Sequence, residues 1–161
     1  MTKLRKLTAL LLAGALTLLL LTACSGGGGS SGPEAQAEAK VMRAIRSNSS
    51  TKNLKYDVDM CYIAKNELAN TDLDAELKGY IGGYGVYHKV KIDQANSTLT
   101  LIAQYDYQNT KLEELIKYIT SDSDASSLNY NQAGRWTKVG VAAKIHQGQT
   151  YIAITLQVKT T

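Results

Sequence analysis

Hydrophobic residues recur with the period of an α-helix in the segment that begins at Pro33. This proline suits the first turn of a helix, because its missing N–H would have no partner there, and residues 35–46 carry apolar side chains on one face. A second apolar stripe, which Asp57 can cap, predicts another helix. The members of this stripe are Met60, Ile63, Ala64 and Leu68. Leu54 and Tyr56, between the two helices, predict a short extended piece.

A glycine-rich loop is predicted at residues 79–85, and beyond it the hydrophobic period changes to two, which is typical of half-buried β-strands. Two hairpins are predicted, one from residues 86–92 and 99–105 and one from residues 137–145 and 150–159. Between the hairpins, Thr110 and Glu113 form a capping box. The apolar positions behind this box predict a third helix that reaches Ile119.

The order of these elements is two helices, a strand pair, a helix and a second strand pair. Strands joined by short turns pair antiparallel, and helices must cover the faces of the resulting sheet. We therefore predict an α+β fold with an antiparallel sheet covered by helices, in one domain over residues 33–161.

The first 23 residues have the pattern of a bacterial lipoprotein signal peptide. A basic start precedes the apolar stretch Leu7–Leu21, which at about 15 residues is shorter than the roughly 20 that cross a bilayer. Residues 21–24 (LTAC) resemble a lipobox, which implies transfer of diacylglycerol to the Cys24 thiol and cleavage after Ala23. An ordinary secretory leader and a short membrane anchor are the alternatives.

Residues 24–32 then form a Gly/Ser-rich tether behind the lipidated Cys24, with a root-mean-square reach of roughly 15 Å. The predicted location is the extracytoplasmic face of a bacterial cell membrane, where two or three acyl chains give a durable anchor. An acylated Cys24 has no thiol left for a disulfide, so we expect Cys61 to be a small buried apolar side chain in its helix.

Charge and composition exclude several classes of function. The chain of 161 residues has a net charge of +4, but without the three basic residues of the leader 15 basic residues face 14 acidic ones. A nearly neutral domain has no general electrostatic attraction to nucleic acid or anionic lipid. Two histidines and one internal cysteine offer little metal-binding or catalytic chemistry, so neither a metal nor another cofactor is expected.

The ten tyrosines are the feature that best suggests binding. Tyrosine offers a large amphipathic contact area at low entropic cost and is enriched at interfaces. Alternatively, tyrosine replaces phenylalanine in the core, because the chain contains no Phe. The candidate binding rim consists of Tyr84, Tyr87, Tyr105, Tyr107 and Tyr130.

Several segments resemble the CAP superfamily, the SCP-like extracellular domain whose bacterial members often follow a lipoprotein leader. Residues 54–57 (LKYD) are similar to the family's PLxWD segment, and residues 101–103 (LIA) are similar to its GENIA motif. Residues 136–141 (WTKVGV) resemble the end of its ILNPxFTxVGVG motif. The resemblance covers most of residues 38–158 and implies an α-β-α sandwich.

The resemblance also implies where a cleft would lie. Family members that bind divalent metal use two histidines and two acidic residues, and the matching positions identified in this chain are Glu67, Thr100 and Ser123. None of these keeps the family's residue, and the two histidines, His88 and His146, stand elsewhere. The three positions therefore mark a candidate cleft without a metal site.

Together these features favour a lipid-anchored interaction module that has lost the family's metal-site residues. Its partner would be a protein, peptide, glycan or lipid in the cell envelope. The alternative is a hydrolase of envelope or peptide substrates, for which Glu67, His88 and Asp124 are the candidate residues. A structural or immunity-type lipoprotein, whose specificity lies in its partner, is a third possibility.

Overall fold

The computed structural model describes residues 32–77, 79–81, 86–106, 111–113, 115 and 136–159, with backbone alone for 79–81 and 86–88. The described elements are two helices and six strands. Their bounds are α2 Pro33–Ser47, β1 Lys55–Tyr56, α3 Val58–Asn70, β2 Gly79–Ile81, β3 Val86–Asp93, β4 Thr98–Tyr105, β5 Trp136–His146 and β6 Gln149–Val158. The predicted α+β class, both early helices and both hairpins are confirmed.

The six strands form one sheet in the order β1-β5-β6-β4-β3-β2. Neighbouring strands are antiparallel, as predicted, except that β1 runs parallel to β5, with Lys55 opposite Lys138 and Tyr56 opposite Val139. The prediction of a wholly antiparallel sheet is therefore wrong at this edge. No tight turn joins β1 to β5, so no hairpin connection imposes an antiparallel direction on the pair.

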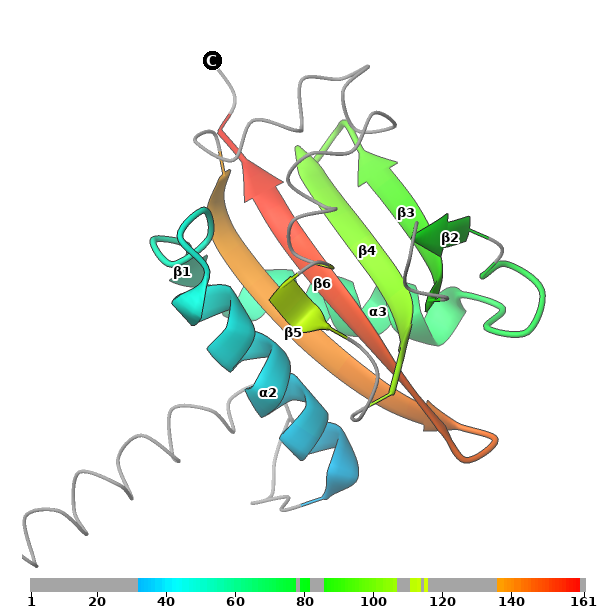
Figure 1. Ribbon diagram of the computed structural model, residues 1–161. Coiled ribbons are helices and arrows are strands. Elements are labelled where there is room, and N and C mark those ends of the chain that lie inside the picture. Colours follow the sequence, from blue (N-terminus) through cyan, green and yellow to red (C-terminus); the bar gives the residue numbers. More distant parts are fainter. Residues whose placement is uncertain are drawn as a thin grey trace, which may run out of the picture.

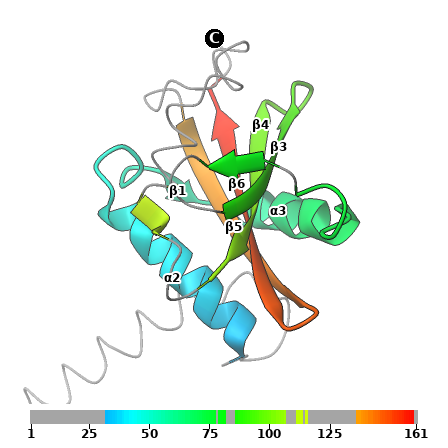
Figure 2. The same cartoon turned by 45° about the vertical axis from the view of Figure 1, so that its right-hand side comes forward.

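The two helices cover opposite faces of the sheet (Figures 1 and 2). Val41 and Ile45 of α2 belong to one hydrophobic core, together with residues such as Leu101 of β4. Leu68 of α3 belongs to a second core, together with the neighbouring residue of β4, Ile102. Because successive side chains of a strand point to opposite faces, the alternation along β4 separates the two cores.

Local interactions place α3 closely on the sheet. The Asp57 side chain accepts hydrogen bonds from the backbone N–H groups of Asp59 (3.0 Å) and Met60 (3.2 Å), so the predicted N-cap is confirmed. Gly140 of β5 lies beneath this first turn. A Cβ atom on Gly140 would lie only 2.1 Å from the backbone nitrogen of Cys61, so the absence of a side chain there allows the helix to approach.

The glycine-rich segment after α3 begins with a strand, where a loop was predicted. Gly79–Ile81 forms the edge strand β2, in which Tyr80 pairs with Tyr87 of β3.

Of the predicted third helix, residues 112, 113 and 115 are helical, and the Leu115 N–H donates to the Lys111 carbonyl at 3.2 Å. The remainder of that prediction lies outside the described residues. None of the helices in the described part of the chain is long and apolar enough to cross a membrane.

Candidate functional site

Two of the three predicted cleft positions lie on the same face of the sheet, the face that α3 covers. Glu67 of α3 forms an ion pair with Lys91 of β3, with 2.6 Å between Oε2 and Nζ. Lys91 is the register partner of Thr100 on β4, so these two side chains project from the same face. The third position, Ser123, lies outside the described residues.

Thr100 belongs to the packed interior on this face. Its side chain is 2% exposed, and its Oγ1 lies 2.8 Å from Oγ1 of Thr155, which is fully buried. Thr155 is in turn the register partner of Gly140, the residue against which the first turn of α3 packs. Thr100 therefore supports the contact between the sheet and α3, and Glu67 at the margin is paired with a lysine.

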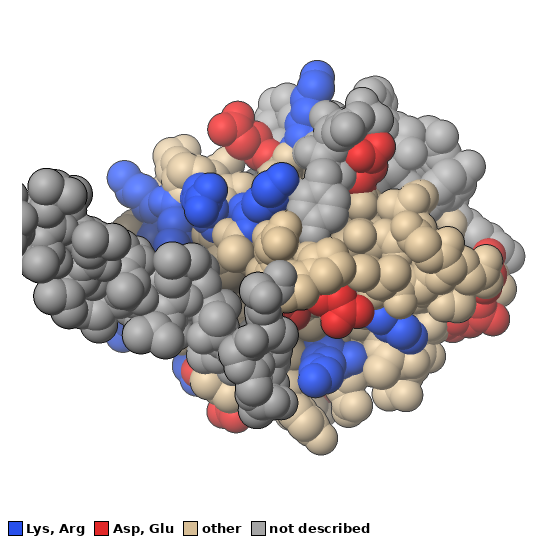
Figure 3. Space-filling view, turned by 90° about the horizontal axis from the view of Figure 1, so that it is seen from below, with Lys and Arg blue, Asp and Glu red and all other residues tan. Residues whose placement is uncertain are grey.

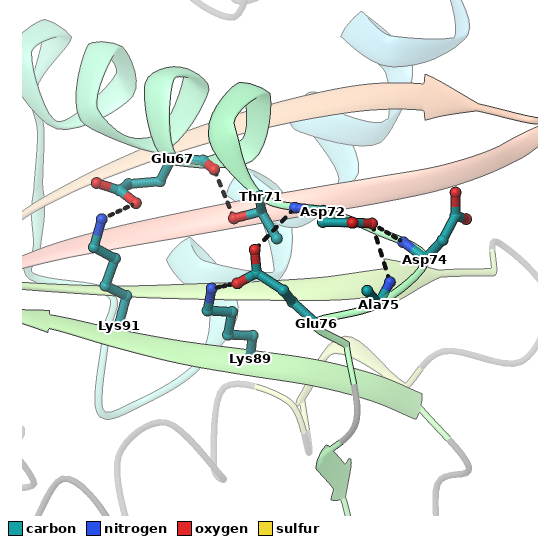
Figure 4. A network of polar contacts seen from close by, with 8 residues as sticks. All are labelled: Glu67, Thr71, Asp72, Asp74, Ala75, Glu76, Lys89 and Lys91. Carbon is teal, nitrogen blue, oxygen red and sulfur yellow. Dashed lines mark hydrogen bonds and ion pairs between the residues drawn. The ribbon is translucent and has the colours of Figure 1, made fainter.

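The segment that follows α3 carries a network of acidic residues with structural partners (Figure 4). The Asp72 side chain accepts hydrogen bonds from the backbone N–H groups of Asp74 and Ala75, both at 3.1 Å. Glu76 accepts a hydrogen bond from the Asp72 N–H at 3.2 Å and forms an ion pair with Lys89 of β3. These contacts fasten the turn after α3 to the neighbouring strand.

His146, the last residue of β5, has a carboxylate partner. Its Nε2 lies 3.1 Å from Oδ2 of Asp74, and the same oxygen accepts a hydrogen bond from the Gln147 amide at 3.1 Å. The Tyr151 ring stands edge-on to the imidazole, with 6.2 Å between the centroids. Burial and the nearby Asp74 raise the pKa of Tyr151. No local pattern could have revealed a pair whose members are 72 residues apart.

The predicted tyrosine rim is placed only in part. Tyr105 is 2% exposed and lies in the core on the α2 side, so its ring cannot line an exposed rim; at this position tyrosine fills the core. Tyr87 is described by its backbone, as a member of β3. Tyr84, Tyr107 and Tyr130 lie outside the described residues, as does Asp124 of the hydrolase alternative. Of the other two candidates of that alternative, His88 belongs to β3 and pairs with Ala103, and Glu67 is the residue paired with Lys91.

The most exposed large hydrophobic residues of the described chain lie on the outer side of α3. Val58 is 60% exposed and Tyr62 is 69% exposed, and the two are one helical turn apart. The buried residues of the same helix, such as Ala64 and Leu68, face the sheet. The apolar stripe predicted for this helix does not include this pair, although two hydrophobic residues outside the stripe of an amphipathic helix can be found in the sequence.

Cys61 is buried in α3, with 4% of its surface exposed, as predicted. Its sulfur is in a disulfide bond, which differs from the prediction that a disulfide is excluded. The second cysteine of the sequence, Cys24, lies outside the described residues. An acylated Cys24 cannot also take part in a disulfide, so the state of Cys61 depends on whether Cys24 is lipidated.

Among the described residues, no three His, Cys, Asp or Glu side chains lie close enough together to hold a metal ion. A scan of protein-family models, a search of curated proteins and a search of solved structures each found no match to the chain. The fold and its sites therefore define the class as an α+β domain with a mixed sheet between two helices.

Proposed function

We propose that this chain is a lipid-anchored, extracytoplasmic interaction module of a bacterial cell envelope, with a CAP-like α-β-α sandwich as its folded part. The lipobox-like residues 21–24 supply the anchor, and the Gly/Ser tether leads directly into α2, whose first residue is Pro33. Because acylation uses the Cys24 thiol and the chain has only two cysteines, the anchored form has Cys61 as a thiol in place of its disulfide. The placement of helices on both faces of one sheet supports the CAP-like architecture.

The observation that carries the binding function is the exposed pair Val58 and Tyr62. A large aromatic side chain that is mostly in water gains contact area when a partner covers it, and tyrosine can still satisfy its hydroxyl at the edge of an interface. The two side chains stand one turn apart on a helix whose opposite side is packed on the sheet, so they form a rigid contact surface. We take a protein of the envelope as the partner of this surface.

Site-specific photocrosslinking in intact cells tests this surface. A photoreactive amino acid at Tyr62 should give one discrete protein adduct, and Val58→Ser should reduce the yield. The control probe replaces Ser49, which is also exposed but lies in the turn after α2. Equal adduct patterns from positions 62 and 49, or a yield that Val58→Ser leaves unchanged, would exclude this surface as the binding site.

Lipidation of Cys24 is tested separately, with Cys61 as the matched control cysteine. Cells are fed an alkyne-bearing fatty acid, and the mass of the purified chain is measured. The Cys61→Ser variant should incorporate the label and lose the leader, whereas Cys24→Ser should do neither. Incorporation that is independent of Cys24 would contradict lipidation at the lipobox.

A hydrolase is the second candidate, and the contact between Asp74 and His146 favours it. A carboxylate that orients an imidazole is a common part of acid–base sites. If the domain cleaves peptide or envelope substrates through this pair, His146→Gln should remove the activity. Lys65→Gln, a change at an exposed position of α3, should leave the activity intact. Equal activity of the two variants would exclude this pair as the catalytic site.

A further inference from the structure

The two acidic residues of α2 are both turned toward the edge of the sheet. Oε1 of Glu38 accepts a hydrogen bond from the Ala143 N–H at 3.0 Å, and Oε1 of Glu34 accepts one from the Ile145 N–H at 2.8 Å. The glutamates are one helical turn apart and the two N–H groups are two strand residues apart. Both carboxylates therefore cover backbone donors of the edge strand β5 beyond its short pairing with β1.

The charged residues on the opposite side of α2 are basic. Lys40, Arg43 and Arg46 are all exposed, and their spacing of three residues places them along one side of the helix, away from the buried Val41 and Ile45. Within the described part of the chain, no carboxylate forms an ion pair with Arg43 or Arg46. We refer to Lys40, Arg43 and Arg46 as the basic face of α2.

Figure 3 shows several Lys and Arg side chains close together on one part of the molecular surface, and further ones beside Asp and Glu side chains elsewhere. On the other face of the sheet, the acidic residues at or beside α3 are paired with lysines: Glu67 with Lys91, Asp57 with Lys138 and Glu76 with Lys89. The near-neutral net charge therefore conceals a local excess of positive charge on α2, where Arg43 and Arg46 have no such ion pair among the described residues. This local excess changes the expectation from net charge that the domain has no attraction to anionic lipid, because an interface responds to the charges that face it.

We propose that the basic face of α2 docks onto anionic phospholipid headgroups of the membrane that carries the lipid anchor, so that the domain rests on the bilayer in one orientation. This inference rests on the proposed lipidation of Cys24. The tether of residues 24–32 has a reach of roughly 15 Å and enters α2 directly, which holds this helix near the lipid surface. Each lysine or arginine near an anionic surface strengthens the association about fivefold.

Docking through α2 has a consequence for the proposed binding surface. The helices lie on opposite faces of the sheet, so a membrane-bound α2 directs the outer side of α3 away from the bilayer (Figure 2). Val58 and Tyr62 would then face the envelope, where a protein partner can reach them.

Energy transfer from the domain to the bilayer tests the orientation. The full chain, processed and acylated by cells, is reconstituted into vesicles that contain acceptor-labelled lipid, with a fluorophore at Ser47 on α2 or at Asn66 on α3, both exposed. In phosphatidylglycerol vesicles, transfer from position 47 should exceed transfer from position 66. The difference should vanish in phosphatidylcholine vesicles and in 1 M salt, where the Debye length is about 3 Å.

The triple variant K40Q/R43Q/R46Q should lower the ratio of docked to undocked domain about 100-fold, since three cations are lost. The matched control K65Q/K144Q/K159Q removes the same charge from positions outside the basic face and should keep the difference. Equal transfer from both positions in an acylated chain, or docking that persists in the triple variant, overturns the docking proposal alone. A purified chain whose mass shows no acyl groups would contradict the lipidation of Cys24, and with it the docking that rests on lipidation. This readout is the mass of the chain and is independent of the energy transfer.

Discussion

Thr100 and Thr155 share a buried hydrogen bond across two strands of the sheet, with 2.8 Å between their side-chain oxygens. They are direct register partners on β4 and β6, and their exposed fractions are 2% and 0%. Each hydroxyl is therefore a partner of the other in the layer between the sheet and α3. A position that the family resemblance assigns to a metal site serves here as part of the packing.

Replacing one of these two hydroxyls should cost more stability than replacing both. Thr100→Val and Thr155→Val each leave the other oxygen buried without this partner, and each should lower the free energy of unfolding by about 1–3 kcal/mol. The double variant places two methyl groups in contact and should recover most of that loss. Urea denaturation of the four chains measures the coupling. Additive losses would show that the two hydroxyls do not interact in the folded state.

Gly140→Ala should be among the most damaging single substitutions in the chain. The added Cβ would meet backbone atoms of Met60 and Cys61 at 2.2 and 2.1 Å, so α3 must shift away from the sheet. We expect a loss of about 3 kcal/mol in the free energy of unfolding. Gly32→Ala is the control, because nothing lies within 4 Å of its added Cβ. Equal unfolding midpoints for the two variants would show that α3 does not need this close approach.

The elements of the fold that depend on nearby residues could be predicted from the sequence. The Asp57 cap forms its hydrogen bonds within three residues, and the second hairpin turns at Gln147 and Gly148, whose positive φ values of 50° and 78° suit a tight hairpin turn. β1 was recognised as extended but not as the parallel partner of β5. That partner is more than 80 residues away, and a two-residue strand has too little pattern to specify it.

The candidate sites depended on long-range pairs and were predicted less well. Glu67 was singled out, but its partner Lys91 belongs to a strand whose register no local pattern fixes. The contact of Asp74 with His146 escaped for the same reason. Glu38 illustrates a further difficulty, because a glutamate in a helix is ordinarily expected in water, whereas here it binds the sheet edge.

Glu38→Gln should stabilise the domain at neutral pH. Burial raises the pKa of Glu38, the hydrogen bond from Ala143 lowers it, and Glu34 raises it further. With a folded-state pKa above the unfolded value of about 4.3, the contribution of Glu38 is fully present in acid and is lost as the pH rises through the folded-state pKa. Glutamine retains the oxygen that accepts from the Ala143 N–H but carries no charge to bury.

Chemical denaturation of the Glu38→Gln variant between pH 4 and pH 8 measures this effect. The variant should gain stability over the parent chain as the pH rises, and the gap should close in acid. Glu34→Gln is the control, since Glu34 makes the same kind of hydrogen bond but is exposed. A gap that is constant over this pH range would show that charge burial at Glu38 does not affect folding.

Asp57 should make the start of α3 sensitive to acid. The hydrogen bond from Lys138, at 2.8 Å, lowers the pKa of this carboxyl, and hydrogen bonds from the Met60 and Asp59 backbone lower it further. A folded-state pKa below the unfolded value of about 3.9 gives stability that is present at neutral pH and is lost as the pH falls through the folded-state pKa. The stability that this contact supplies should therefore be lost as the pH falls below the unfolded-state pKa of Asp57.

Two substitutions separate the charge of Asp57 from its capping role. Asp57→Asn keeps an oxygen for the cap and should lose the acid-dependent part, so its stability falls below that of the parent chain at pH 7 and approaches it near pH 3. Asp57→Ala loses the cap as well, which should cost about 1 kcal/mol more at every pH. Urea denaturation at pH 3 and pH 7 distinguishes the two effects. If the asparagine variant retains the parent's full pH dependence, the ion pair with Lys138 does not contribute to it, and the capping bonds alone position α3.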